Sequence, residues 1–288
     1  MFAPELRAEG DTLVLGRISD DPKAHYEQLK PLLDYVVPRM EKVGIRQGRI
    51  LMAKDVQQMA SYLRRGRVDW VTETSAGGML LAERGGAVPL LRTSRGGKSS
   101  YATVFFVRRG SRIHSLAQLR GRSVAFQNRA STSAYFMPAD ELLDQGLSLE
   151  QLLSPHDQPG PDAVGFMFAR SERNIVTWVA KGLVDAGAIN DGDWVSPSRV
   201  PAAFRDELRL IHTGPRLPRG IEMVGTRVPG AVRKRLREVL LAARHDPAAA
   251  PALKAFFGTT AFQPIDAETR AQLAHIRAAT VRVRREVE

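Results

Sequence analysis

Residues 123–138, SVAFQNRASTSAYFMP, constrain the fold of this chain more than any other stretch. The apolar run at residues 123–126 follows Gly121 and predicts a short, buried parallel strand. A polar turn comes next, and Ser131 then stands at the N-cap position of a predicted helix, with Thr132 and Ser133 in its first turn. This order of strand, turn and capped helix is typical of a βαβ unit.

The same helix start is a candidate anion site. The first turn of a helix leaves about four backbone N–H groups without intrahelical partners and carries about half a positive charge. Three consecutive hydroxyl groups at residues 131–133 add further donors. A phosphate, phosphonate or sulfate could therefore be held there without a lysine. The alternative interpretation is an ordinary serine N-cap that binds no ligand.

Short apolar runs alternate with helical patterns along the rest of the chain, which predicts an α/β fold with largely parallel sheets. Strands are expected at residues 12–16, 49–52, 68–71, 88–92, 103–108, 123–126, 163–168, 184–189, 208–213 and 221–226. Helices are expected at residues 26–43, 55–65, 74–84, 134–145, 174–181, 231–244 and 266–285.

Four groups of residues occur in a fixed order along the chain. They are residues 66–71 (GRVDWV), residues 101–108 (YATVFFVR) with 115–122 (SLAQLRGR), residues 131–138 (STSAYFMP) and residues 182–188 (GLVDAGA). Together, over about residues 12–265, they resemble the phosphonate/phosphate/phosphite-type substrate-binding proteins of bacterial ABC importers, which have the type II periplasmic-binding-protein fold. Ala134 is a departure, since the family has glycine after its Ser-Thr-Ser motif.

The resemblance implies two lobes, each a mainly parallel sheet flanked by helices, with the ligand in the cleft between them. Lobe one would comprise residues 1–101 and, on the return of the chain, residues 209–288 with the C-terminal helix; lobe two would comprise residues 102–208. The implied function is a periplasmic receptor that captures a phosphonate, phosphite or phosphate-like anion. It would close by hinge motion and deliver the ligand to an ABC permease in the membrane.

The resemblance also implies ligand-binding residues in both lobes. Residues 131–133 match the family motif and are the first candidates. Tyr101 matches the tyrosine that opens the hinge strand and could offer its hydroxyl, or it could simply pack at a lobe boundary. Thr74 and Ser75 would start a second hydroxyl-bearing helix in lobe one.

Three acidic side chains and one amide are further candidates. Glu73 precedes Thr74, where many relatives have an aromatic residue, and could receive a ligand ammonium group or simply favour the helix start. Glu172 begins a helix and could face the ligand. Asn190 and Asp191 follow a predicted strand, where open α/β sheets place ligand-contacting groups.

Two departures from the aminophosphonate-binding relatives concern ligand choice. Those relatives have a tyrosine where this chain has Val56, and a histidine where it has Ser171 and Glu172. Because the Ser-Thr-Ser motif is retained, these departures predict an anionic headgroup with an altered side group.

Catalytic motifs are not found in the sequence. There is no cysteine, the six histidines are dispersed, and Arg92 stands where a phosphate-binding loop ending at Lys98-Ser99 would need glycine. We therefore predict a binding protein with no catalytic residue, no metal and no cofactor. An enzyme of the cofactor-biosynthesis type on the same fold, with Glu73, Glu172 or Asp191 as acid or base, and a ligand-sensing domain remain alternatives.

The net charge of +11, from 42 Lys and Arg against 31 Asp and Glu, raises the question of nucleic-acid binding. The arginines are scattered through predicted helices, and no aromatic residues interleave with them as a stacking surface requires. We interpret them as solvated helix faces that attract anions in general, and expect no nucleic-acid partner.

The two ends of the sequence carry separate expectations. Residues 1–10 lack the basic start and apolar stretch of a secretory signal, so we expect the signal peptide of an exported protein to be absent from this sequence. At the other end, Leu273, Ile276, Val283 and Val287 form a narrow apolar stripe on the last helix. That stripe could pack on its own lobe or pair with a second copy, so a homodimer is an alternative.

Overall fold

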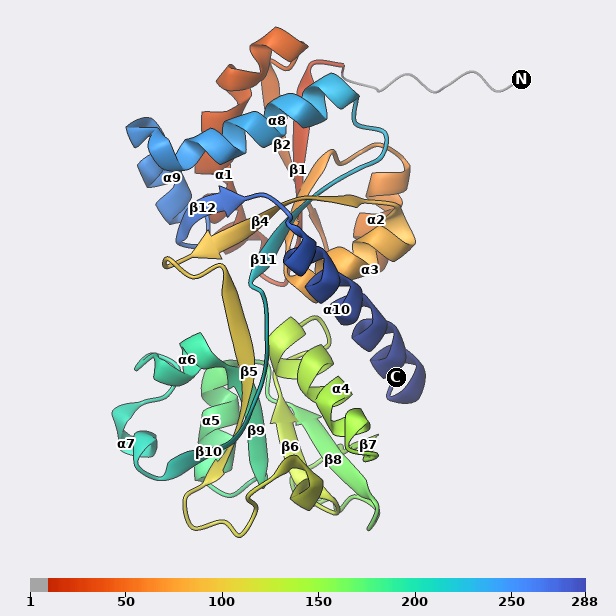
Figure 1. The fold of residues 1–288 in the computed structure, drawn as a ribbon, viewed down its shortest axis with the longest axis vertical. Helices are drawn as coiled ribbons and strands as arrows, with labels where there is room; N and C mark the ends of the chain where they lie inside the picture. The colour runs from red at the N-terminus through yellow and green to blue at the C-terminus, as the bar shows by residue number, and fades with distance from the viewer. Residues whose placement is uncertain (1–9) are drawn as a thin grey trace, which may run out of the picture. The chain divides into compact units, whose positions relative to one another are not determined.

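The structure, a computed structural model, describes residues 10–288 and divides into two compact units. Unit 1 comprises residues 10–100 and Pro218–Ala271, and unit 2 comprises Tyr101–Leu217 and Gln272–Glu288. Each unit contains a six-stranded sheet with helices beside it (Figure 1). The predicted α/β class is confirmed, although both sheets are mixed and not purely parallel.

Unit 1 has the strand order β12-β4-β11-β3-β1-β2. β1 is parallel to β2 and β3, and β11 is antiparallel to both β3 and β4, so β4 runs in the same direction as β1 to β3. The carboxyl ends of these four strands therefore share one edge of the sheet. The strands are β1 (Thr12–Ile18), β2 (Gln47–Ala53), β3 (Trp70–Glu73), β4 (Val88–Arg95), β11 (Gly220–Val224) and β12 (Thr259–Gln263).

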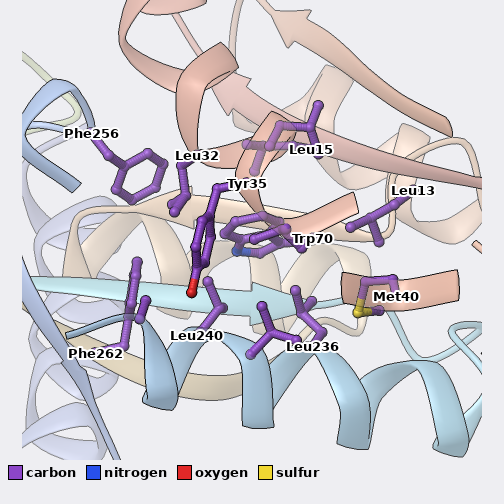
Figure 2. Packing of buried hydrophobic residues seen from close by; sticks show 14 of the residues in the cluster. Leu13, Leu15, Leu32, Tyr35, Met40, Trp70, Leu236, Leu240, Phe256 and Phe262 are labelled. Atoms are coloured by element: carbon purple, nitrogen blue, oxygen red, sulfur yellow. The ribbon is translucent and has the colours of Figure 1, made fainter. Parts of the chain in front are cut away.

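The core of unit 1 surrounds the indole of Trp70. Figure 2 shows Trp70 between Leu13 and Leu15 of β1 and the side chains of Leu236 and Leu240 on α8. All five are buried, and apolar burial of this kind is the main favourable contribution to folding. The helices of this unit are α1 (Pro22–Val36), α2 (Val56–Arg64), α3 (Ser75–Gly85), α8 (Gly230–Ala242), α9 (Ala250–Ala255) and the first turn of α10 (Ala267–Glu286).

Unit 2 has the strand order β10-β5-β9-β6-β8-β7 (Figure 1). β6 is parallel to β8 and β9, β7 is parallel to β8, and β5 is antiparallel to β9. Its strands are β5 (Ser100–Arg108), β6 (Ser123–Phe126), β7 (Ser148–Gln151), β8 (Ala163–Phe168), β9 (Ala186–Asn190) and β10 (Leu208–Pro218). Its helices are α4 (Met137–Asp144), α5 (Glu172–Ala180), α6 (Asp191–Val195), α7 (Ala202–Arg205) and most of α10.

The unit boundaries differ from the predicted ones on the return of the chain. We expected residues 209–288 in lobe one, but residues 209–217 and 272–288 group with unit 2. On α10, Arg282 pairs with Asp140 at 3.4 Å and with Asp144 at 2.5 Å. The hydroxyl of Tyr135 donates to the Glu288 carboxylate at 3.1 Å. These contacts join residues far apart in sequence, so no local pattern could have indicated them.

Helix ends and short elements also differ from expectation. The helix predicted at residues 26–43 begins at Pro22 and ends at Val36, after which Val37–Val43 forms a 3₁₀ turn containing Pro38. Five short elements of four to six residues each were not predicted: β7, β12, α6, α7 and α9. Elements this short carry too few periods of an apolar pattern to be distinguished from loops.

Among residues 10–288, no helix combines the length and the apolar character needed to cross a bilayer.

Candidate functional site

One edge of the unit 2 sheet gathers most of the predicted site residues. β6, β8 and β9 are parallel, so their carboxyl ends meet at this edge. β5 is antiparallel to β9, with Thr103 opposite Asn190, so the start of β5 at Tyr101 lies at the same edge. The topology thus brings residues 131–133, Glu172, Asn190 and Asp191 to the edge at which β5 begins.

The helix start at Ser131 is firmly held. Its Oγ accepts a hydrogen bond from the Ala134 N–H at 3.2 Å, as predicted for an N-cap. Behind it, the Gln127 N–H donates to the Ala134 carbonyl at 2.9 Å, and the Thr103 hydroxyl donates to the Ser133 carbonyl at 2.9 Å. The turn is therefore tied to the loop after β6 and to β5, while the Ser131 hydroxyl proton is not used by the cap.

The turn that follows Ser131 is a π-helical one, over Thr132–Phe136, and it leads directly into α4. Ala134 departs from helical geometry, with φ −121° and ψ 19°. Thr132 is 1% exposed and Ser133 7% exposed. Single π-helical turns of this kind are frequent at functional sites because they re-aim the backbone groups of one turn.

The predicted residues at the ends of β9 and β5 are engaged in contacts within unit 2. Asp191 accepts from the Ala102 N–H at 3.2 Å and pairs with Arg216 at 3.2 Å. The Asn190 side chain caps α6 by accepting from the Asp193 N–H at 2.9 Å, and its amide also donates to the Asp193 carboxylate. Tyr101 is 4% exposed. Asp191 and Asn190 thus stabilise the edge, whatever else they contact.

Glu172 occupies the first position of α5. Ser171 caps this helix by accepting from the Asn174 N–H at 3.2 Å. Burial raises the pKa of Glu172, and the nearby Asp193 carboxylate raises it further. Arg199 lies 3.8 Å from Glu172 and offsets part of this effect. Burial therefore holds the Glu172 carboxyl closer to its neutral form than it would be in water.

In unit 1, Thr74 and Ser75 differ in what their hydroxyls do. Thr74 is the N-cap of α3 and accepts from the Gly77 N–H at 3.4 Å. Ser75, which is fully buried, donates its hydroxyl to the Pro218 carbonyl at 2.6 Å. The Ser75 proton is therefore committed to holding the backbone that enters β11, whereas the Thr74 proton is not needed for its cap.

Glu73 is buried, and residues of unit 1 provide its hydrogen-bond and ion-pair partners. Its carboxylate accepts from the Ile18 N–H at 3.3 Å and from the Thr74 N–H at 3.0 Å, and Arg17 lies 3.6 Å away. A Cβ at Gly77 would lie 2.8 Å from the Glu73 Oε2 atom, so a side chain there would require the carboxylate to move. The arrangement favours the helix-start role of Glu73 over reception of a ligand ammonium group.

Two residues with unusual environments were missed by sequence reasoning. Glu222 lies in the centre of β11 with no exposure and accepts hydrogen bonds from Trp70, Thr72 and Thr93. A lone acid in the apolar run GIEMV was the signal available for it. Arg170 adopts a left-handed backbone with φ 68° between β8 and α5. Only its position directly before the cap Ser171 could have drawn attention to it.

Elsewhere in unit 2, Glu141 on α4 and His212 on β10 form a carboxyl–imidazole pair, with Oε2 and Nε2 2.6 Å apart. Burial raises the pKa of Glu141 from 4.5 to about 8, with the Asp140 and Asp144 carboxylates adding to the effect. Burial lowers the pKa of His212 below 6.5. The folded pair therefore keeps one proton up to about pH 8, whereas in the unfolded chain the last proton leaves His212 near pH 6.5.

This pair predicts a pH dependence of stability. Between about pH 6.5 and 8 the unfolded state binds fewer protons than the folded state, so the free energy of unfolding should fall as pH rises, by about 1–2 kcal/mol. Urea unfolding at the two ends of this range measures the change. Glu141→Gln should flatten the profile, and a wild-type profile that is already flat would contradict the prediction.

Among residues 10–288, no three His, Cys, Asp or Glu side chains are grouped so that they could hold a metal ion.

Comparison with known proteins decides the family. A family model described as "ABC transporter, phosphonate, periplasmic substrate-binding protein" matches residues 16–269, which is most of the chain. The chain belongs to this family. The family consists of periplasmic substrate-binding proteins of ABC transporters and not of enzymes. The prediction of a binding protein is therefore confirmed over the alternative of an enzyme on the same fold. Its functional partners are a small ligand and a membrane permease.

Solved structures of other proteins have the same fold. XAC2383 from Xanthomonas citri, bound to chloride ion, shares 53% identity with this phosphonate-family protein; the match covers 96% of this chain and 100% of that one, with a TM-score of 0.92. A second structure of XAC2383 is bound to ATP, at 52% identity and the same coverage and TM-score. PhnD1 from Prochlorococcus marinus, in complex with methylphosphonate, shares the fold at 15% identity, with 96% and 99% coverage and a TM-score of 0.69.

Proposed function

We propose that this family member captures a phosphate- or phosphonate-type oxyanion at the helix start of residues 131–133 and presents it to the permease of an ABC importer. The observation that carries the proposal is the Ser131-capped turn at the carboxyl edge of the unit 2 sheet. Its hydroxyls and first-turn amides form a set of donors that needs no lysine.

The known ligands of related proteins support an anion. Chloride and ATP, both described with XAC2383, are anions, and ATP ends in phosphoryl groups. The methylphosphonate of PhnD1 has the tetrahedral oxyanion that a hydroxyl-rich helix start suits. What these ligands share is negative charge and oxygen or halide acceptors, which the hydroxyl and amide donors at residues 131–133 would complement.

The other predicted site residues take different parts in this proposal. In unit 2, the Tyr101 hydroxyl is proposed as an additional ligand donor and Glu172 as an acceptor for a hydroxyl or amine on the ligand. In unit 1, the Thr74 hydroxyl is proposed as a donor at the start of α3. Asn190 and Asp191 are proposed to act mainly by holding the unit 2 edge, because each has partners within the unit. In unit 1, Ser75 and Glu73 are proposed to stabilise the start of α3 and not to contact the ligand, because each has a partner within that unit.

A homodimer through α10 is not part of the proposed function. Leu273, Ile276 and Val283 on its apolar stripe are at most 4% exposed in the single chain. A stripe already covered within one chain has little apolar surface left for a second copy, so its burial supports packing on the chain's own fold.

A thermal-shift panel tests the function. Phosphate, phosphite, methylphosphonate, sulfate and ATP would each be added at equal ionic strength, with chloride-free potassium acetate as the baseline because a net charge of +11 attracts anions in general. A ligand at 100 times its dissociation constant should raise the free energy of unfolding by about 2.7 kcal/mol. If none of the phosphorus oxyanions stabilises the protein beyond the acetate baseline, the proposal fails.

A further inference from the structure

Arg170 has a backbone conformation that arginine rarely adopts. Its φ of 68° lies in the left-handed region, which costs most side-chain-bearing residues free energy and is found most often at turns and ligand sites. The residue stands between the end of β8 and Ser171, the cap of α5. The fold therefore holds this particular residue in place at the edge where the oxyanion is proposed to bind.

A single residue, Gln127, connects the Arg170 backbone to the turn that follows Ser131. The Arg170 N–H donates to the Gln127 carbonyl at 2.8 Å, and the Gln127 N–H donates to the Ala134 carbonyl, in the first turn after Ser131, at 2.9 Å. Parallel pairing of Phe126 with Phe168 sets this arrangement, because the loops after β6 and β8 leave the sheet side by side. Arg170 is thus a direct neighbour of the anion-binding turn.

The guanidinium of Arg170 is uncommitted, unlike its neighbours. The side chain is exposed and has no hydrogen-bond or ion-pair partner among residues 10–288. By contrast, Arg129 bonds to Gln151 at 2.7 Å and pairs with Glu288 at 3.5 Å. Arg199 pairs with Glu172 at 3.8 Å. Of these three cations at the unit 2 edge, Arg170 is the one whose charge and donors remain available to a ligand.

We propose that Arg170 is a specificity-determining residue that selects ligands carrying a second phosphoryl group. The inference rests on the proposed function, in which residues 131–133 hold the first phosphoryl group without a cation. A guanidinium offers a planar fork of donors that matches phosphate oxygens bidentately, and the backbone that carries it is joined through Gln127 to the turn that follows Ser131. The favoured class is therefore a diphosphate, either inorganic pyrophosphate or a diphosphate ester.

The test compares Arg170→Asn with wild type, because asparagine tolerates the left-handed backbone and only the charged fork is lost. Arg122→Asn is the matched control: Arg122 is also exposed and has no side-chain partner among residues 10–288, but it precedes β6 at the opposite edge. Calorimetry would measure methylphosphonate, inorganic pyrophosphate and ADP with all three proteins. Comparing pyrophosphate with ADP distinguishes an inorganic ligand from an ester.

Arg170→Asn should weaken pyrophosphate or ADP binding by about 10- to 100-fold and change methylphosphonate binding by less than about 3-fold, with Arg122→Asn like wild type. Equal weakening of methylphosphonate and the diphosphates, or no weakening at all, would overturn the role of Arg170 and leave the proposed function standing. Wild type that binds methylphosphonate but neither diphosphate would overturn this inference alone. Wild type that binds none of the three probes would also overturn it, while the proposed function would still be judged by the full oxyanion panel.

Discussion

Replacing Ser131 and Thr132 together with alanine is expected to abolish oxyanion binding while the protein stays folded. Each hydrogen bond to a charged group is worth about 1.5–3 kcal/mol, so two lost hydroxyls should weaken binding by about 3–6 kcal/mol, or roughly two to four orders of magnitude. The loss of the Ser131 cap, which accepts from Ala134 at 3.2 Å, should cost about 1 kcal/mol of stability.

Calorimetry with the oxyanion that gives the largest thermal shift measures the binding, and circular dichroism checks the fold. Asp266→Ala is a suitable control. Asp266 caps the start of α10 by accepting from the Thr269 N–H at 2.7 Å. The substitution therefore removes a comparable cap far along the chain from residues 131–133. The control should bind like wild type. A double variant that retained wild-type affinity would show that the oxyanion is bound elsewhere.

Of the substitutions predicted to affect stability, Glu222→Ala should lower the free energy of unfolding most. Glu222 is fully buried and accepts from the Trp70 indole N–H at 2.6 Å and from the Thr72 and Thr93 hydroxyls at 2.9 Å each. Burial raises the pKa of this carboxyl, and the three hydrogen bonds partly offset the effect. Alanine would leave three buried donors without this acceptor, so the free energy of unfolding should fall by about 3–5 kcal/mol.

Denaturant unfolding of three variants separates this role from a general effect of charge. Glu222→Gln keeps a carbonyl acceptor for the donors and should lose less than half as much stability as Glu222→Ala. Glu238→Ala removes an exposed partner of Arg235, at 3.4 Å on the same helix, and should change stability by less than about 0.5 kcal/mol. A Glu222→Ala variant as stable as Glu238→Ala would show that the buried network contributes little.

Local signals in the sequence predicted much of the fold. β6 and β8 have the bounds expected from their apolar runs, and Asp55, Thr74 and Ser131 cap helices at or near the predicted positions. These features depend on interactions within a few residues, because a capping oxygen bonds two or three residues ahead and an apolar run is contiguous. The same locality made the helix start at residues 131–133 visible as a candidate site.

Whether a candidate side chain is available to a ligand was decided only by the tertiary structure. The sequence offered Glu73, Ser75 and Asp191 as candidates alongside Thr74, yet Arg17, Pro218 and Arg216 engage them across 56, 143 and 25 residues of chain. Arg170 was not a candidate, although the fold leaves its guanidinium without a partner among residues 10–288. The sequence by itself therefore determined which residues could bind an anion through local geometry. Only long-range pairing decided which of them keep their charge or their donors for it, because a side chain's partner is set by the strands and helices packed beside it and not by its neighbours in the chain.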